Sequence, residues 1–377
     1  MWVKLVYSQL LYHGYNVTIT IAGNSCEGVY GDMDELISII HGSGGRETWN
    51  VVSRYIVKRI PEKLWRVMNG AGLDVLDDGS YVKVGDQYLI FSSDSFTVNP
   101  IFFPGGDIGH LAASGVLNDL VMMGARPVAF IDNIVVEEGF PFKDLEKIIE
   151  SMAKVLIENN VALIGGDFKV MPRGSIDKIV IGGFGVGVST YKPIIDRVEP
   201  GDKIIVTGYI AEHGSAILAA QLGMLDNAPG IRSDSRPLVK TVLPVIEKYH
   251  EYIDGARDPT RGGLATVLNE WVFNTPYAIV IDRREIPVRS EVRGFLDALG
   301  IDPLNVACEG VAVLAVKPEV AEEVVDMLRK NGEKQARIIG EVIEPDNDVL
   351  RGRVVAVTEV GGKVVIQPNP LNLPRIC

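Results

Sequence analysis

Hydrophobic and polar positions follow two distinguishable patterns along the chain, one helical and one extended. Apolar residues recur at helical spacing in segments 47–60 and 143–160, which predicts a helix in each. Segment 107–124 has the same period, carries small residues on one face and ends in glycine, so it also predicts a helix. Segment 81–94 predicts a hairpin-like pair of strands, and 125–136 predicts a buried strand. The first half of the chain therefore mixes helices with strands.

The mixture of helices and strands continues along the chain. Segment 161–167, VALIGGD, predicts a short apolar strand running into a Gly-Gly-Asp turn. Segment 178–189 contains GFGVGV, which lacks the following helix of a dinucleotide-binding loop and is more typical of a strand. From about Tyr191 onward strands and helices alternate without a nucleotide-binding fingerprint. We therefore expect an α/β protein with α+β layers in each half.

This organisation predicts two folded domains between two atypical ends. The expected boundaries are 1–32 for an atypical N-terminal extension, 33–190 for the first domain, 191–355 for the second and 356–377 for an extended tail. Three prolines in the last ten residues favour extended backbone. At ~3.1 Å per residue, about ten such residues reach ~30 Å. The tail could therefore bring its last residue into a cleft or out to a partner.

Composition narrows the possible functions. The 377 residues are 47% hydrophobic and 23% charged, an ordinary globular balance, and the formal net charge is −12. Such an acidic chain disfavours non-specific nucleic-acid binding, although a bound metal can still supply positive charge for a nucleotide. We find no apolar run of the ~20 residues that a membrane span needs, and no convincing signal peptide. We therefore expect a cytoplasmic protein that binds neither nucleic acid nor membrane.

The cysteines raise a specific question. Cys26, Cys308 and Cys377 form no CxxC pair and are odd in number, which disfavours a disulfide framework and a structural zinc site. Cys377 is the last residue, following a proline-marked tail. Termini are normally the least ordered part of a domain, and an exposed thiol there is a liability unless it is used. For the terminus alone, an inert residue is the simpler interpretation.

Carboxylates gather at turns and in one apolar helix. The motif LDVLDDG holds Asp77 and Asp78, SSDSF holds Asp94, GGDFK holds Asp167 and Lys169, and ARDPTRGG holds Asp258. Mg²⁺ prefers carboxylate and amide oxygens together with substrate phosphates. Taken singly, each aspartate is more simply a turn former or a helix cap.

The pair Asn118 and Asp119 lies within the apolar helix predicted over 107–124. A buried acid needs a partner, so this pair is the hardest to explain structurally.

Other candidate residues carry weaker signals. HGSGG, with Gly44 and Gly45, is a candidate phosphate loop, but glycine-rich turns are common. His213 precedes a predicted helix and could belong to its cap. Glu309 precedes an apolar strand beside Cys308 and is either a strand-end acid or a general base with a tuned pKa. Composition alone favours the structural interpretation of Glu309.

Together the motifs resemble the HypE family of hydrogenase maturation proteins, in the superfamily of aminoimidazole ribonucleotide synthetase and selenophosphate synthetase. The resemblance covers residues 33–377, almost the whole chain. The motifs that carry it, in order, are HGSGG, LDVLDDG, FFPGGDIGHLAASGVLNDLVMMGARP, GGDFKV, ARDPTRGGLATVLNE, ACEG and terminal PRIC. Within the superfamily, FFPGGDIG and PRIC are specific to HypE.

The resemblance implies a PurM-like fold of two α/β domains, a homodimer, and an ATP site formed where the N-terminal domains meet. Cys377 would accept a carbamoyl group from a HypF-like carbamoyltransferase. ATP would then activate the amide oxygen, and the resulting thiocyanate would supply cyanide for [NiFe]-hydrogenase through a HypC–HypD complex. Glu309 is the first choice of proton acceptor, with Lys169 and His213 as supporting candidates.

The resemblance also implies a ligand set for ATP and Mg²⁺. The residues expected to bind the cofactor are Asp77, Asp78, Asp94, Asn118, Asp119, Asp167, Asp258, Gly44 and Gly45. Those expected to hold the metal are Asp78, Asp94, Asp119 and Asp258.

Two other interpretations stay open. A small-molecule ATP-dependent kinase or synthetase of the same superfamily would be active without Cys377. A non-catalytic scaffold would keep its function after charge removal at Asp119 or Asp167. The PRIC ending weighs against both, and the acid cluster weighs against the scaffold.

Overall fold

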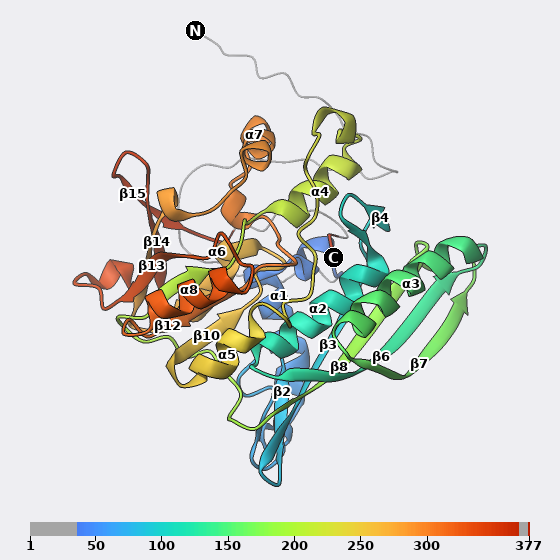
Figure 1. Ribbon diagram of the computed structural model, residues 1–377, viewed down its shortest axis with the longest axis horizontal. Helices are drawn as coiled ribbons and strands as arrows, with labels where there is room; N and C mark the ends of the chain where they lie inside the picture. Colours follow the sequence, from blue (N-terminus) through green and yellow to red (C-terminus); the bar gives the residue numbers. More distant parts are fainter. Residues whose placement is uncertain (1–35, 369–375) are drawn as a thin grey trace. The chain divides into compact units, whose positions relative to one another are not determined.

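Two large β-sheets organise the chain, seen here in a computed structural model that describes residues 36–368 and 376–377 (Figure 1). The predicted extension 1–32 lies outside the described residues, as do residues 369–375 of the predicted tail. Residues 38–377 form one unit, in which each sheet carries its own helices.

The first sheet is mostly antiparallel, and only its β6–β7 pair is parallel. Its strands, in spatial order, are β1 (Gly70–Ala71), β2 (Ser80–Val84), β3 (Gln87–Phe96), β8 (Ile179–Ser189), β6 (Arg126–Glu137) and β7 (Ala162–Met171). A short hairpin of β4 (Phe102–Phe103) and β5 (Gly106–Asp107) precedes the first long helix.

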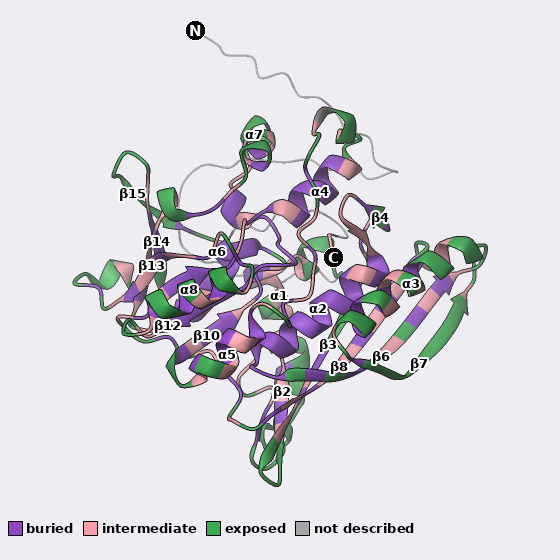
Figure 2. Ribbon diagram, viewed as in Figure 1, coloured by how far each residue is buried: buried purple, intermediate pink, exposed green. Residues whose placement is uncertain are grey.

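Helix α2 (Ile108–Met122) packs on β3 and β8, and α3 (Phe142–Glu158) packs on α2. Glycine makes this close approach possible. A Cβ added to Gly183 or Gly185 of β8 would lie 2.7 or 2.6 Å from the Val116 side chain, closer than real Cβ atoms come. The glycines of the GFGVGV motif therefore leave room for α2 to pack closely on the face of β8. Figure 2 shows α2 buried along its length, whereas β7 at the sheet's edge is exposed.

Most expected elements of this half are confirmed, with two differences. The helix predicted over 47–60 is irregular: α1 (Gly45–Val51) continues as the π- and 3₁₀-helical turns η2 (Val52–Ile56) and η3 (Val57–Arg59). The turn predicted within 161–167 is wrong. Its Gly-Gly-Asp residues stay inside β7, which pairs with β6 up to Met171, so tertiary pairing overrides the local preference of the glycines.

The second sheet is mixed and has helices on both faces. Its strands, in spatial order, are β10 (Ile253–Arg257), β12 (Val313–Val316), β9 (Lys203–Val206), β13 (Arg337–Ile343), β11 (Ala278–Asp282), β14 (Arg353–Val357) and β15 (Lys363–Ile366). One core cluster joins the sheet to residues of α4 (Glu212–Gln221), α6 (Gly263–Val272) and α7 (Ser290–Leu299). A separate cluster joins it to α5 (Leu243–Tyr249) and α8 (Ala321–Lys330).

Short 3₁₀ turns occupy several connections. They are η1 (Ile39–Gly42), η4 (Glu62–Leu64), η5 (Leu225–Asn227), η6 (His250–Tyr252), η7 (Arg283–Glu285), η8 (Pro303–Asn305) and η9 (Asp348–Leu350).

The end of the chain returns to the first sheet. Strand β15 pairs with β14, so the second sheet extends beyond the expected start of the tail at 356 and reaches Ile366. Ile376 and Cys377 then pack, partly buried, against the core beneath α2. The backbone N–H of Thr97, which follows β3, donates to a main-chain carboxylate oxygen of Cys377 over 3.1 Å. The last two residues are therefore docked against the folded protein. In the described part of the chain, no helix combines the length and the apolar character needed to cross a bilayer.

Candidate functional site

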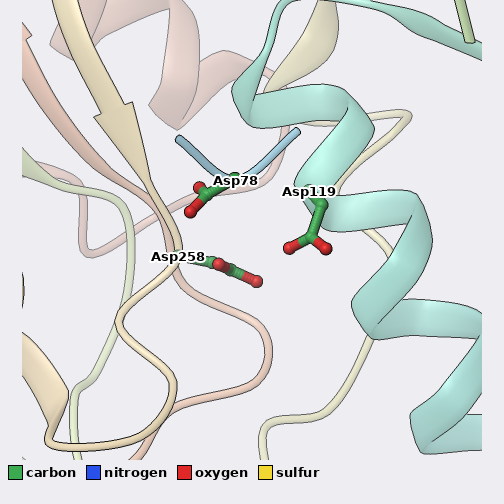
Figure 3. Close-up of side chains that lie close together, drawn as sticks. All are labelled: Asp78, Asp119 and Asp258. Atoms are coloured by element: carbon green, nitrogen blue, oxygen red, sulfur yellow. The ribbon is translucent and has the colours of Figure 1, made fainter. Parts of the chain in front are cut away.

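Three carboxylates from distant segments converge between the two sheets (Figure 3). Asp78 precedes β2, Asp119 lies on α2, and Asp258 follows β10. One oxygen of each lies within 4.8 Å of the corresponding oxygens of the other two. Asp119 is only 9% exposed and Asp258 6%. These three residues, called the acid trio below, therefore concentrate carboxylates in a region that is largely shielded from solvent.

The electrostatics of the acid trio favour a cation. Burial raises the pKa of Asp258 to about 7, with the charge of Asp94 as the next contribution. Burial also raises the pKa of Asp119, and the neighbouring aspartates raise it further. Among the described residues, Asp78 Oδ2 and Asp258 Oδ2 are buried without a hydrogen-bond partner. Unpaired carboxylate oxygens grouped in this way suit a hard divalent ion such as Mg²⁺.

Arg257 fixes the loop that carries Asp78. Its guanidinium lies 2.5 Å from the Asp78 carboxylate, 3.4 Å from that of Asp77 and 2.5 Å from that of Asp196. Asp77 also accepts a hydrogen bond of 2.9 Å from the Asp196 backbone N–H. The carboxylate of Asp77 is thus engaged in joining the two sheets. Arg257 was missed by the sequence analysis, although a basic residue directly before the DPT motif, beside an expected acid cluster, was a usable signal.

The neighbours of the acid trio come from β3 and α2. The Ser92 hydroxyl donates a short hydrogen bond to Asp119. Asp94, two residues further along β3, adds negative charge near Asp119 and Asp258 but is not one of the three grouped carboxylates, although it was expected among the metal ligands. Asn118 accepts from the Leu238 N–H over 2.8 Å and donates to the Arg236 and Glu309 carbonyls. Its buried amide therefore holds the second domain's loops, a task not foreseen from the sequence.

The glycine-rich HGSGG segment packs on the turn after Asp258. Gly44 and Gly45 both have left-handed backbone conformations, with φ of +87° and +75°. A Cβ on Gly44 would lie 3.1 Å from the Arg261 carbonyl oxygen. Arg261 in turn donates to the Gly42 carbonyl over 3.0 Å. The segment and the DPTRGG turn are therefore brought together, and the expected phosphate contacts of the two glycines stay a prediction.

Cys377 and Glu309 share an acidic, partly closed environment. Burial raises the pKa of the Cys377 thiol, and the negative charge of Glu309 raises it further, while Arg261 opposes them. Glu309 is 1% exposed, and its Oε1 has no hydrogen-bond partner among the described residues. Burial and the charge of Asp258 raise its pKa. The docked tail thus places its thiol near a buried carboxyl group that has an unused oxygen.

The loop that carries Glu309 is fixed by Asp234. The Glu309 backbone N–H donates to both oxygens of the Asp234 carboxylate at 3.2 Å, and the Gly310 N–H donates at 3.0 Å. Asp234 also accepts from the His213 backbone N–H at 3.0 Å. This carboxylate therefore orders Glu309 and His213 together, and no local pattern in the sequence marked it.

His213 is fully buried and holds the tail. Its Nε2 lies 2.7 Å from the Ile376 carbonyl oxygen, and its Nδ1 lies 2.7 Å from the Ser233 hydroxyl. Burial lowers its pKa to about 4. Its expected part in proton removal stays a prediction.

Asp167 and Lys169 lie apart from these residues within one chain. They form an exposed ion pair of 3.4 Å on β7. Asp167 pairs with Asn133, which pairs with Gly182, which pairs with Ser95 beside Asp94. Three strand spacings separate Asp167 from β3, about 14 Å. A single chain therefore does not bring Asp167 or Lys169 to the acid trio.

Family models cover most of the described residues. The model of the AIR synthase related protein N-terminal domain matches residues 76–189, and that of the C-terminal domain matches residues 199–353. Among curated relatives, a hydrogenase expression/formation protein of Methanocaldococcus jannaschii is 41% identical over 344 residues, 90% of this chain and 99% of that protein. A carbamoyl dehydratase HypE of Rhizobium leguminosarum is 35% identical over 344 residues, covering 90% and 95%.

Solved structures give the same result. A HypE in complex with ATP has a TM-score of 0.72 and 35% identity, covering 90% of this chain and 99% of that chain. A HypE–HypF complex contains a chain with a TM-score of 0.74 and 33% identity, covering 84% and 99%. The expected PurM-like fold of two α/β domains is confirmed by these matches.

Proposed function

The chain belongs to the HypE family of AIR synthase related proteins, and on that premise we propose that it is an ATP-dependent carbamoyl dehydratase. The enzyme converts S-carbamoyl-Cys377 to a thiocyanate and so supplies the cyanide ligand of [NiFe]-hydrogenase. One observation carries the proposal: the terminal cysteine is docked near a buried glutamate and an acid cluster suited to a metal ion.

In the reaction the carbamoyl oxygen leaves as phosphate. S-carbamoyl-cysteine and ATP give thiocyanate, ADP, inorganic phosphate and one net proton. Mg²⁺, when bound, offsets phosphate charge during the transfer. Asp78, Asp119 and Asp258 would hold the metal, with Asp94 on the neighbouring strand near the phosphates. Gly44 and Gly45 would contribute backbone N–H groups to the nucleotide.

Glu309 is the proposed proton acceptor. The amide nitrogen loses two protons as the C≡N bond forms, so a base must stand beside the sulfur. The Glu309 carboxyl is buried, has an unused oxygen and has a raised pKa, which brings its proton affinity closer to that needed at neutral pH. Lys169 is the supporting candidate that a second chain would contribute.

The tail has to work in two positions. Carbamoylation needs a thiolate, and the docked environment raises the thiol pKa. We therefore place carbamoyl acceptance outside the cleft, on a HypF-like carbamoyltransferase, and dehydration inside it. A relative forms a HypE–HypF complex, which supports this partner. A HypC–HypD complex is the proposed cyanide acceptor, and the cytoplasm is the proposed compartment.

A homodimer completes the site in this proposal. Strand β7 exposes Leu163, Ile164 and Phe168 at 50%, 61% and 52%, and these residues help to line an open groove of about 530 Å³ that also includes Asp167. A second copy on this face would cover apolar surface that a monomer rarely leaves open. It would also carry Asp167 and Lys169 toward the nucleotide of its neighbour.

These roles assign a task to each predicted domain. The domain over 33–190 binds ATP and dimerises, the domain predicted over 191–355 carries Glu309 and His213, and the end of the chain beyond β15 presents Cys377. The small-molecule kinase or synthetase remains the competing function.

Nucleotide turnover separates the two functions. In a single-turnover experiment with carbamoylated protein and Mg²⁺–ATP, we expect one ADP per carbamoylated chain. Cys377→Ala should abolish this ADP formation, and Cys308→Ala should not, because Cys308 is a buried core residue. ADP formation that continues in Cys377→Ala at the unaltered rate would instead favour the small-molecule enzyme.

A further inference from the structure

The FFPGGDIG motif and the PRIC ending are far apart in sequence but belong to one contact network. The motif forms the β4–β5 hairpin. At its tip the Pro104 carbonyl accepts a 2.8 Å hydrogen bond from the Ser233 N–H. Gly105 has φ of +107°, and a Cβ there would lie 2.7 Å from the Ser233 carbonyl oxygen. The hairpin therefore needs glycine at this point and fixes the position of Ser233.

Ser233 then fixes the ring of His213. Its hydroxyl accepts from the Ser235 N–H at 3.0 Å and lies 2.7 Å from His213 Nδ1. The Ile376 carbonyl can only accept, so His213 Nε2 must carry the ring proton, and Nδ1 must accept from Ser233. Phe103 of the hairpin meets the ring edge-on, with centroids 5.5 Å apart. One tautomer and one ring orientation are thereby selected.

The selected ring acts on the tail. His213 bonds the Ile376 carbonyl at 2.7 Å, and the Thr97 N–H donates to a carboxylate oxygen of Cys377 at 3.1 Å. The Ile376 side chain lies over Gly214, where an added Cβ would come within 3.3 Å of Ile376 Cδ1. Two successive main-chain oxygens are held, one by each domain, and the charge of Glu309 acts on the Cys377 thiol held there.

We propose that His213 is a positioning residue that docks the Ile376 carbonyl and thereby sets Cys377 beside Glu309. The inference rests on the proposed role of Cys377. Both ring nitrogens are already engaged, so His213 serves as a neutral donor here and not as the proton acceptor. Its lowered pKa of about 4 keeps it neutral at physiological pH.

Alkylation of Cys377 measures docking without any turnover. Full-length protein is treated with iodoacetamide, and the C-terminal peptide is quantified by mass spectrometry, which separates Cys377 from the other cysteines. His213→Ala loses one hydrogen bond to the tail, so the docked state is populated less. We therefore expect the Cys377 thiol of this variant to be alkylated about three- to tenfold faster than that of wild type. His213→Gln keeps an N–H donor and should stay closer to wild type.

His250→Ala is the matched control, because that ring stacks on Tyr191 and bonds the Glu247 carbonyl. It should alkylate at the wild-type rate. Equal alkylation of wild type and His213→Ala, with both folded, would overturn the proposal. Ser233→Ala supplies a second variant if His213→Ala does not fold, and it should also speed alkylation.

Two further measurements separate positioning from other roles. A double-mutant cycle, measured by thermal unfolding, combines His213→Ala with deletion of residues 376 and 377. The free energy of unfolding lost on His213→Ala should be smaller when the two residues are absent. An identical cost with and without them would show a merely structural ring and overturn the proposal. With carbamoylated protein, dehydration should slow in His213→Ala and recover in His213→Gln. Equal loss in both variants with unchanged alkylation would indicate a base instead. If docking responds as expected while Cys377 proves not to be the acceptor, the proposed function fails and the docking contact stands.

Discussion

Arg257 holds the carboxylate of Asp78 at 2.5 Å, and this ion pair joins β10 of the second sheet to the loop that enters β2 of the first. The same guanidinium reaches Asp77 and Asp196, and its side chain is 17% exposed. The neighbouring residue, Asp258, belongs to the acid trio. One dipeptide therefore both joins the two domains and supplies a member of the acid trio.

Removing Arg257 should destabilise the fold strongly. Arg257→Met leaves three mutually close carboxylates without their cation, so we expect a loss of about 3–5 kcal/mol in the free energy of unfolding. Urea denaturation followed by circular dichroism measures it. Arg126→Met is the control, because its 2.5 Å pair with Glu247 is 61% and 34% exposed and should cost less than about 1 kcal/mol. Similar losses in the two variants would contradict the assigned role of Arg257.

Asp119→Asn should separate metal binding from folding. The amide can still accept from Ser92, and the substitution removes a buried charge, so metal-free stability should be unchanged or higher. Wild type should gain about 2.7 kcal/mol from Mg²⁺–ATP at 100 times its Kd, and the variant should lose most of this gain. Thermal unfolding with and without Mg²⁺–ATP measures both quantities. Asp144→Asn on α3, whose partly exposed side chain forms a 3.8 Å ion pair with Lys147, should behave as wild type.

Metal-free protein should lose stability as the pH rises from 6.5 to 7.5. The folded pKa of Asp258 is about 7, above its ordinary value of 3.8, so the folded state binds more protons than the unfolded state in this range. Stability present at lower pH is therefore lost as Asp258 ionises, by roughly 0.7 kcal/mol from this residue alone. The lowered pKa of His213 acts in the opposite direction, mainly below about 6.5, and offsets roughly 0.3 kcal/mol of this loss between pH 6.5 and 7.5. Chemical denaturation in EDTA measures the slope, which Asp258→Asn should reduce; an unchanged slope in that variant would assign it to other groups.

Glu309→Gln should stop the chemistry without preventing assembly. Carbamoylation of the tail and Mg²⁺–ATP binding should persist, because the side chain is nearly isosteric and lies outside the acid trio. Dehydration should fall by about 10²- to 10⁴-fold if Glu309 is the base. Removing its charge should also lower the Cys377 thiol pKa and speed alkylation of the docked tail. Single-turnover quench measures the rate, and a loss below tenfold would assign proton removal to another group.

Two inactive variants should restore each other if the site is shared between chains. Lys169→Gln damages the contribution of one subunit, and Glu309→Gln damages that of the other. After subunit exchange in a one-to-one mixture, half of the dimers are mixed and each has one intact site, so we expect about a quarter of wild-type activity. Sedimentation velocity measures whether the mixture is dimeric. Mixed dimers that stay inactive would place both residues in the site of a single chain.

The sequence predicted the site better where one motif holds the needed residue and worse where distant segments meet. Asp119 stands out as a charge in an apolar helix, and the structure buries it with Asp78 and Asp258. Periodicity could not show that these three converge, because their segments are joined only by tertiary packing; the family motifs supplied that expectation. The role of Arg257 was missed for the same reason, since its partner Asp78 is 179 positions away.

Strand β7 shows the limit of local turn chemistry. Gly165 and Gly166 favour a turn, yet pairing with β6 holds them extended. From the sequence we predicted only that an extended tail is long enough to enter a cleft. The contacts that dock the tail depend on His213, Ser233 and the β4–β5 hairpin, which come from three separate segments.

The mass of the intact protein tests the central claim most directly. The protein is incubated with its carbamoyltransferase partner and carbamoyl phosphate, and Mg²⁺–ATP is then added, with Cys377→Ala and Cys308→Ala in parallel. We predict an adduct of one carbamoyl group that is absent only from Cys377→Ala, and that loses one water after Mg²⁺–ATP is added. An active partner that leaves Cys377 unmodified, or a carbamoyl adduct that keeps its water after Mg²⁺–ATP is supplied, would contradict the account.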